Sequence, residues 1–189
     1  MAASGGISRG KRKDLLMKQI RRVTEADIDT LVHMARTTFA DTFNANTAPA
    51  DMQAFLATAY APEQLLSELR TPGTTFWFVT IDDVPAGYMK LNVDAAVTAD
   101  VLAQNALELE RIYILPTYKR HGLGSLLYAH ALQLAQTLGK TKIALGVWEH
   151  NEPAKNFYQR RGFKKVGEHA FVVGDDPQHD WLMEADVQV

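Results

Sequence analysis

The sequence predicts a single α/β domain in which helices flank a central mixed, mostly antiparallel sheet. Residues 75–81 and 86–93 are rich in β-branched and aromatic side chains and are separated by Asp82-Asp83, which is typical of an antiparallel hairpin. Residues 107–148 read as strand, helix and strand, which indicates a right-handed β-α-β unit. The chain has 189 residues, of which 47% are hydrophobic and 22% charged, a size and composition that suit one core.

The first 17 residues differ from the rest of the chain. They are rich in Gly, Ser, Lys and Arg and have no periodic hydrophobic positions. We therefore expect a disordered tail or a non-native leader with Met17 as the natural start, and a folded domain over 18–189. A basic localisation arm is the functional alternative for this tail.

The N-terminal half of the domain reads as one strand and three helices. Residues 18–23 form the strand, and a capping box of Thr24 and Asp27 then opens a helix that runs to about Phe43. Hydrophobic residues at helical spacing predict two more helices over 47–60 and 62–70, which we expect to cover the site.

The C-terminal half starts with the hairpin and a loop over 95–106. A strand over 107–114 leads into a helix over 122–138, and the nearly all-apolar run 142–148 is typical of a buried strand in a parallel pair. A short helix over 153–161 is opened by Asn151 and ended by Gly162. Two further strands surround 163–166 and 181–184.

The strand, turn and helix over 112–127 predict an anion site. Gly122 and Gly124 allow the backbone to approach a ligand, and the first turn of the helix offers N–H groups with a partial positive charge. A diphosphate suits such a site. The turn has neither the third glycine of the dinucleotide fingerprint nor the Gly-Lys-Ser/Thr of a P-loop. The alternative is an ordinary turn whose glycines only make room for packing.

This turn, Lys119 to Gly124, resembles the Gln/Arg-x-x-Gly-x-Gly/Ala motif of the GNAT acetyltransferase superfamily, with Lys119 in the Gln/Arg place. A second stretch, Asn151-x-x-Ala154-x-x-x-Tyr158-x-x-x-Gly162-Phe163, resembles the pattern that follows the fifth strand in that family. The order of elements over 18–187 is similar to the whole GNAT fold, which implies splayed fourth and fifth strands. The resemblance implies that acetyl-CoA contacts the backbone of Ile112, Tyr113 and Ile114, the turn residues Lys119, Arg120, His121, Gly122, Leu123, Gly124 and Ser125, and the side chain of Asn151.

Acetyl transfer from a thioester to an amine needs a deprotonated amine and a proton for the leaving thiolate. By the same resemblance, Tyr158 is the acid, and the alternative is a core tyrosine that only packs. Glu110 is our first candidate for the base, acting directly or through water, with Glu108 behind it. An exposed strand carboxylate without a role in catalysis is the alternative for both.

A narrower resemblance concerns the acceptor. Residues 41–44, 145–149, 167–171 and 174–180 are similar to PaiA-type spermidine/spermine N-acetyltransferases of bacteria, which implies a polyamine acceptor. Asp175, Asp176 and Asp180 are candidates for a polycation-binding rim, with a polar turn as the alternative. Relatives that acetylate ribosomal-protein N-termini carry a Glu five residues before the motif asparagine, and Gly146 at that place argues against such a substrate.

Composition excludes several other classes of function. The absence of cysteine excludes disulfides, thiolate catalysis and Cys-ligated metals, and the spacing of the histidines predicts no metal site. The chain carries a net charge of −2 and its first 17 residues +3, which leaves −5 on the rest and argues against nucleic acid as a partner. The sequence has no run long enough to cross a membrane and no apolar signal core, so we expect a cytoplasmic protein.

These observations together predict an acetyl-CoA-dependent N-acetyltransferase that acts on a small-molecule primary amine, above all a polyamine. A protein or amino-acid N-acetyltransferase is the main alternative. A CoA-binding regulator with little turnover is the alternative from a different class. The sequence leaves a homodimer open.

Overall fold

The computed structural model describes residues 16–43, 47–98, 101, 103–173 and 176–187. Its centre is a seven-stranded sheet in the order β1-β2-β3-β4-β5-β7-β6. Neighbouring strands are antiparallel except for β4 and β5, which are parallel. The predicted mixed, mostly antiparallel sheet is therefore confirmed. The predicted tail over 1–17 lies almost entirely outside the described residues.

The observed elements follow the predicted order, and most ends lie within about two residues of the expected ones. The clearest difference is at the C-terminus, where the last two strands are longer than predicted and form a long hairpin. The strands are β1 Lys18–Arg22, β2 Thr74–Ile81, β3 Val84–Val93, β4 Ala106–Ile114, β5 Lys142–Trp148, β6 Lys164–Val173 and β7 Asp176–Asp186. The helices are α1 Ile28–Phe43, α2 Pro49–Ala59, α3 Pro62–Arg70, α4 Leu123–Thr137 and α5 Glu152–Gln159.

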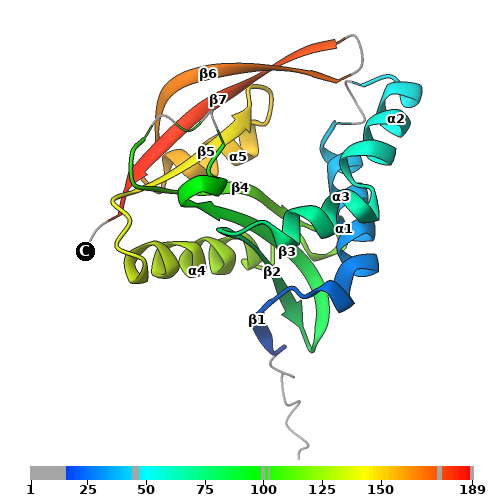
Figure 1. Ribbon diagram of the computed structural model, residues 1–189, viewed down its shortest axis with the longest axis horizontal. Helices are drawn as coiled ribbons and strands as arrows, with labels where there is room; N and C mark the ends of the chain where they lie inside the picture. The colour runs from blue at the N-terminus through cyan, green and yellow to red at the C-terminus, as the bar shows by residue number, and fades with distance from the viewer. Residues whose placement is uncertain (1–15, 44–46, 99–100, 102, 174–175, 188–189) are drawn as a thin grey trace, which may run out of the picture.

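Two hydrophobic cores lie on opposite faces of the sheet. Helices α1, α2 and α3 pack on one face, and α4 and α5 pack on the other (Figure 1). Strand β2 shows how alternation divides the side chains, because Phe76 and Phe78 enter the core under α1–α3 while Trp77 packs toward α4. The hairpin of β6 and β7 extends across the sheet toward α2, which contacts β6 (Figure 1).

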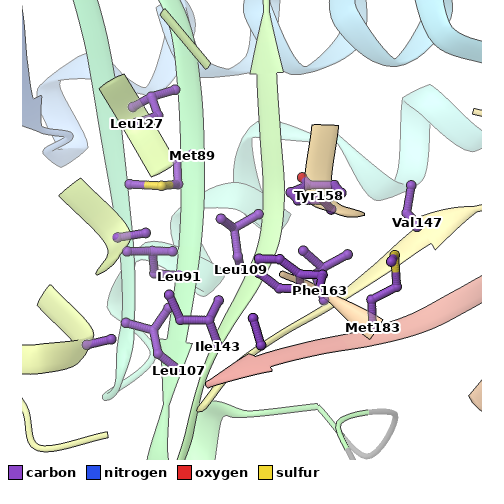
Figure 2. Close-up of a cluster of buried hydrophobic side chains, with 14 of the residues drawn as sticks. Met89, Leu91, Leu107, Leu109, Leu127, Ile143, Val147, Tyr158, Phe163 and Met183 are labelled. Carbon is purple, nitrogen blue, oxygen red and sulfur yellow. The ribbon is translucent and has the colours of Figure 1, made fainter. Parts of the chain in front are cut away.

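The feature that positions the site is the separation of β4 from β5. These strands pair only over 106–108 of β4 and 142–144 of β5. Beyond that point β4 keeps its partner β3 and β5 keeps its partner β7, so both strands stay ordered while they diverge. Figure 2 shows the resulting wedge, with Tyr158 between the two strands. The predicted splay of the fourth and fifth strands is confirmed.

A β-bulge in β4 lies at one predicted site residue, Glu110. The pairing of β4 with β3 passes from Arg111 opposite Lys90 to Leu109 opposite Leu91, which leaves Glu110 without an opposing residue. Glu110 stays on the side of Glu108, because both carboxylates accept from the same amide of β3. Arg111 lies on that side too and contacts Glu110, so the alternation along β4 breaks between these two residues.

Candidate active site

A groove of about 780 Å³ follows the wedge between β4 and β5. It is bordered by α1, the end of β4, the turn before α4, the end of β5 and α5. The groove contains every predicted cofactor-binding residue except His121, whose Nδ1 lies 2.9 Å from the carbonyl oxygen of Lys119 in its own turn. Its lining includes Ile112, Tyr113, Ile114, Lys119, Arg120, Gly122, Leu123, Gly124, Ser125, Asn151 and Tyr158.

The turn before α4 has the backbone geometry of an anion site. Arg120 and Gly122 adopt left-handed conformations with φ of 66° and 77°, so the chain reverses sharply before Leu123 starts the helix. No side chain caps this end of α4. The first-turn N–H groups of α4 therefore face the groove end without a side-chain acceptor, as an anion-binding helix start requires.

The two glycines of the turn are not explained by packing. A Cβ at Gly122 would meet no atom within 4 Å, and one at Gly124 would meet only the ring of Phe157, at 3.9 Å. The glycines therefore leave open space at the start of α4, which disagrees with the alternative that they only make room for neighbours. Gly122 is also favoured by its positive φ.

Positive side chains surround the same turn. Lys119 pairs with Asp41 of α1, with 2.5 Å between Nζ and Oδ2, at the rim of the groove. Arg161 donates to the hydroxyl of Ser125 over 2.8 Å and lies 3.5 Å from the centre of the Phe157 ring. The residues of this end of the groove fit a diphosphate.

Asn151 and Tyr158 belong to the short helix α5. The side-chain oxygen of Asn151 accepts a hydrogen bond of 3.2 Å from the backbone N–H of Ala154 and so caps the helix, as predicted. The Tyr158 ring is 5% exposed and packs 5.4 Å from that of Phe163. Burial raises the pKa of Tyr158, and Arg161 opposes this only in part, so the phenol keeps its proton at neutral pH.

A second pocket, of about 210 Å³, lies where β4, β5 and β7 come together, and we call it the acidic pocket. Two carboxylates of β4, two of β7 and the imidazole of His169 line it, and the described residues of its lining include neither Lys nor Arg. The carboxylates are those of Glu108, Glu110, Asp180 and Glu184. The acidic pocket therefore suits a cation, in contrast to the positive turn of the groove.

The predicted base, Glu110, is held by three donors. Its Oε2 lies 2.6 Å from Lys90 Nζ and accepts a 2.6 Å hydrogen bond from the amide of Asn92, and its Oε1 lies 3.1 Å from Arg111. Glu68 of α3 in turn contacts Lys90 and Arg111, both at 2.9 Å. Sequence reasoning missed this network, and its visible signal is the pair of polar residues, Lys90 and Asn92, inside the mostly apolar run of β3.

Glu108 is also fully engaged. It accepts hydrogen bonds from the backbone N–H of Thr98, over 3.0 Å, from the hydroxyl of the same residue and from Asn92. Its exposed fraction is 5%, so the alternative of a solvated strand carboxylate does not apply. Of the predicted polycation rim, Asp180 lies in the acidic pocket, Asp175 lies outside the described residues, and Asp176 is described for its backbone alone.

A profile of the acetyltransferase (GNAT) family matches residues 33–163. The chain belongs to this family. It is 43% identical over 166 residues to an uncharacterized N-acetyltransferase in the pepI 3′ region of Lactobacillus delbrueckii subsp. lactis, a match that covers 88% of this chain and 95% of the relative. The predicted family, the N-acetyltransferase activity and acetyl-CoA as co-substrate are therefore confirmed.

More distant relatives are named for their substrates or ligands. A spermidine N(1)-acetyltransferase of Thermoplasma acidophilum is 25% identical over 170 residues, which cover 88% of this chain and 95% of the relative. The crystal structure of a PaiA N-acetyltransferase from the same organism, in complex with coenzyme A, superposes with a TM-score of 0.73 at 24% identity, covering 90% of this chain and 99% of that one. This likeness supports the GNAT fold.

Two features are absent from the described residues. No helix there is long and apolar enough to span a membrane. Among the same residues, no three His, Asp or Glu side chains lie close enough together to hold a metal ion.

Proposed function

We propose that this GNAT enzyme transfers acetyl from acetyl-CoA to a primary amine of a polyamine such as spermidine or spermine. The observation that carries the acceptor is the acidic pocket beside the wedge. The groove lining carries Lys119 and Arg120 with one carboxylate, Asp41, whereas the pocket lining carries four carboxylates. An anionic donor and a cationic acceptor are therefore favoured at different ends of one site.

The groove residues fit acetyl-CoA in a defined order. The N–H groups at the start of α4, with Lys119 and Arg120, would hold the diphosphate. The inner edge of β4 over 112–114 would hold the pantetheine through backbone groups, and Asn151 would contact it from α5. When bound, acetyl-CoA supplies an acetyl group that is activated as a thioester.

Two side chains of the chain would move protons. Tyr158 keeps its proton at neutral pH and lies in the wedge, so we assign it the donation of a proton to the leaving sulfur. Glu110 lines the acidic pocket and is our proposed proton acceptor for the amine. Because three donors already hold its oxygens, the route through a water is the one that the geometry favours.

A polyamine is supported by three further observations. The two β7 carboxylates of the pocket, Asp180 and Glu184, can each interact with an ammonium group, and a monoamine supplies only one. The chain outside its first 17 residues carries a net charge of −5. A relative at 25% identity is a spermidine N(1)-acetyltransferase.

The test is a panel of amines at saturating acetyl-CoA, with release of free CoA as the signal. Spermidine or spermine should show a higher kcat/KM than monoamines, amino acids or peptides, and added salt should reduce that preference because it screens charges over about 8–10 Å. Faster turnover of a peptide N-terminus or a free amino acid would overturn the polyamine assignment and leave the acetyltransferase assignment intact. Tight acetyl-CoA binding without turnover of any amine would favour the CoA-binding regulator.

A further inference from the structure

Strand β7 brings a carboxylate to the place where the groove and the acidic pocket meet. Asp180 is paired with Trp148 across the antiparallel strands β7 and β5. Trp148 lines the groove and Asp180 lines the acidic pocket. Directly paired residues of antiparallel strands lie on the same face with Cβ atoms about 4.5–5.5 Å apart. The two cavities are therefore neighbours at this pair of residues.

Gly146 leaves the space that the Asp180 side chain occupies. It lies two residues before Trp148 and so faces the same side of β5. A Cβ on Gly146 would lie 3.2 Å from Oδ2 of Asp180, which is tighter than most contacts of a real Cβ, and 3.7 Å from the Cβ of Asp180. Gly146 does not have a positive φ, so its backbone conformation does not require glycine. Glycine at this position therefore serves to leave space beside β5 for the Asp180 side chain.

The phenol of Tyr113 lies close to both the Asp180 carboxylate and the proposed acid, Tyr158. The Tyr113 side chain lines the groove together with Tyr158. Burial raises the pKa of Tyr113 most, and both Tyr158 and Asp180 are near enough to raise it further. Asp180 and Tyr158 therefore both lie within electrostatic range of the same phenol.

We propose that Asp180, whose side chain fills the space that Gly146 leaves, binds the ammonium group of the amine that is acetylated and holds it where the acidic pocket meets the groove. This assignment rests on the proposed amine acetyltransferase function and adds the residue that places the acceptor. Asp180 acts as an ion-pair partner and forms no covalent bond. Glu184, the other β7 carboxylate of the acidic pocket, then meets a distal ammonium group of a longer amine.

The two proposed roles predict different effects on the amine KM for Asp180 and for Glu184. Every acceptor has a reacting amine, so Asp180→Asn should raise KM for a monoamine and for spermidine by similar factors of at least tenfold. Glu184 lines the same pocket on the same strand, and Glu184→Gln should raise KM for spermidine and leave that for a monoamine within twofold. Asp186→Asn is the matched control, because Asp186 is an exposed residue of β7 that pairs with Lys142 and lies outside both cavities.

The experiment measures KM and kcat for spermidine and butylamine at saturating acetyl-CoA, with the acetyl-CoA dissociation constant from calorimetry as the check on folding. An Asp180→Asn variant that binds acetyl-CoA normally and has the amine KM values of Asp186→Asn would overturn the assignment. Gly146→Ala provides a second test that keeps the carboxylate. Its added methyl should displace Asp180 and raise both amine KM values by about three- to tenfold, and unchanged values would count against the role of the open space.

The same variants distinguish a failure of the polyamine assignment from a failure of the Asp180 assignment. If the wild type acetylates a peptide amine and no polyamine, the polyamine assignment fails. The comparison of Asp180→Asn with Asp186→Asn is then made with that peptide, and a tenfold rise in KM still supports Asp180 as the acceptor-binding residue, while equal values remove it.

Discussion

The most direct test of the proposed chemistry is the replacement of Tyr158 by phenylalanine. The change removes one oxygen from a side chain that is 5% exposed and keeps the ring that packs against Phe157 and Phe163, with centroids 5.3 and 5.4 Å away. We therefore expect the free energy of unfolding to change by no more than about 1 kcal/mol, the usual net contribution of one hydrogen bond. The dissociation constant of acetyl-CoA should stay within twofold.

Turnover should fall much more than stability. A positioned proton donor contributes on the order of 10²-fold or more, and a 10²-fold loss of kcat corresponds to about 2.7 kcal/mol in the barrier. Because burial raises the pKa of Tyr158 above its usual value of 10.0, the wild type should not lose activity through this phenol below about pH 10. The variant should be slow at every pH in that range.

The assay is steady-state release of free CoA, with calorimetry for acetyl-CoA and chemical denaturation for stability. Tyr113→Phe is a matched control, since Tyr113 lines the same groove and loses the same oxygen. Equal kcat for Tyr158→Phe and the wild type would remove Tyr158 from the mechanism. A loss of several kcal/mol in stability, with kcat retained by the folded fraction, would favour the core-tyrosine alternative.

Three further predictions concern the groove, the core and the first helix. Gly124→Val should raise the acetyl-CoA dissociation constant, measured by calorimetry, at least tenfold or about 1.4 kcal/mol, because the branched side chain extends into the open space at the start of α4. An unchanged constant in a folded variant would mean that the turn has only a structural role. Leu127→Ala should lower the free energy of unfolding in denaturant by about 2–5 kcal/mol, since Leu127 is a fully buried residue of α4 that packs in the core. A cost below about 1 kcal/mol would contradict the packing described for that helix. Hydrogen bonds from Arg21 hold the pKa of Asp27 below its usual value of 3.8, so the difference in free energy of unfolding between the wild type and Asp27→Asn at pH 7 should shrink as the pH falls below about 4. A difference in unfolding free energy that stays constant with pH would contradict this ion pair.

Local patterns predicted the parts of the site that are local in the chain. The turn from Lys119 to Gly124 and the cap at Asn151 are each formed by residues within a few positions of one another, so backbone preferences determine them. The strand, helix and strand over 107–148 likewise follow from periodicity. The groove could therefore be assigned from the sequence by resemblance.

The acceptor side depends on contacts that no local pattern reveals. The register shift opposite Lys90 puts Arg111 on the same side of β4 as Glu110, and strict alternation does not show where a bulge will form. The donors that hold Glu110 come from separate strands and are themselves engaged by a helix residue, Glu68. Asp180 reaches Gly146 only because β7 pairs with β5 in one particular register. Tertiary pairing, and not residue preference, determines these positions.

The divergence of β4 and β5 also affects the tendency of this protein to pair its strand edges with other chains. An unpaired strand edge is a template on which a foreign strand can add, and such edges commonly lie at the border of a sheet. Here two such edges face each other inside the sheet, between strands that are each paired on their other side. The backbone groups that we propose bind the cofactor are thereby kept away from neighbouring molecules. This fold can therefore leave strand edges open for a ligand without the aggregation hazard that they would bring at the border of the sheet.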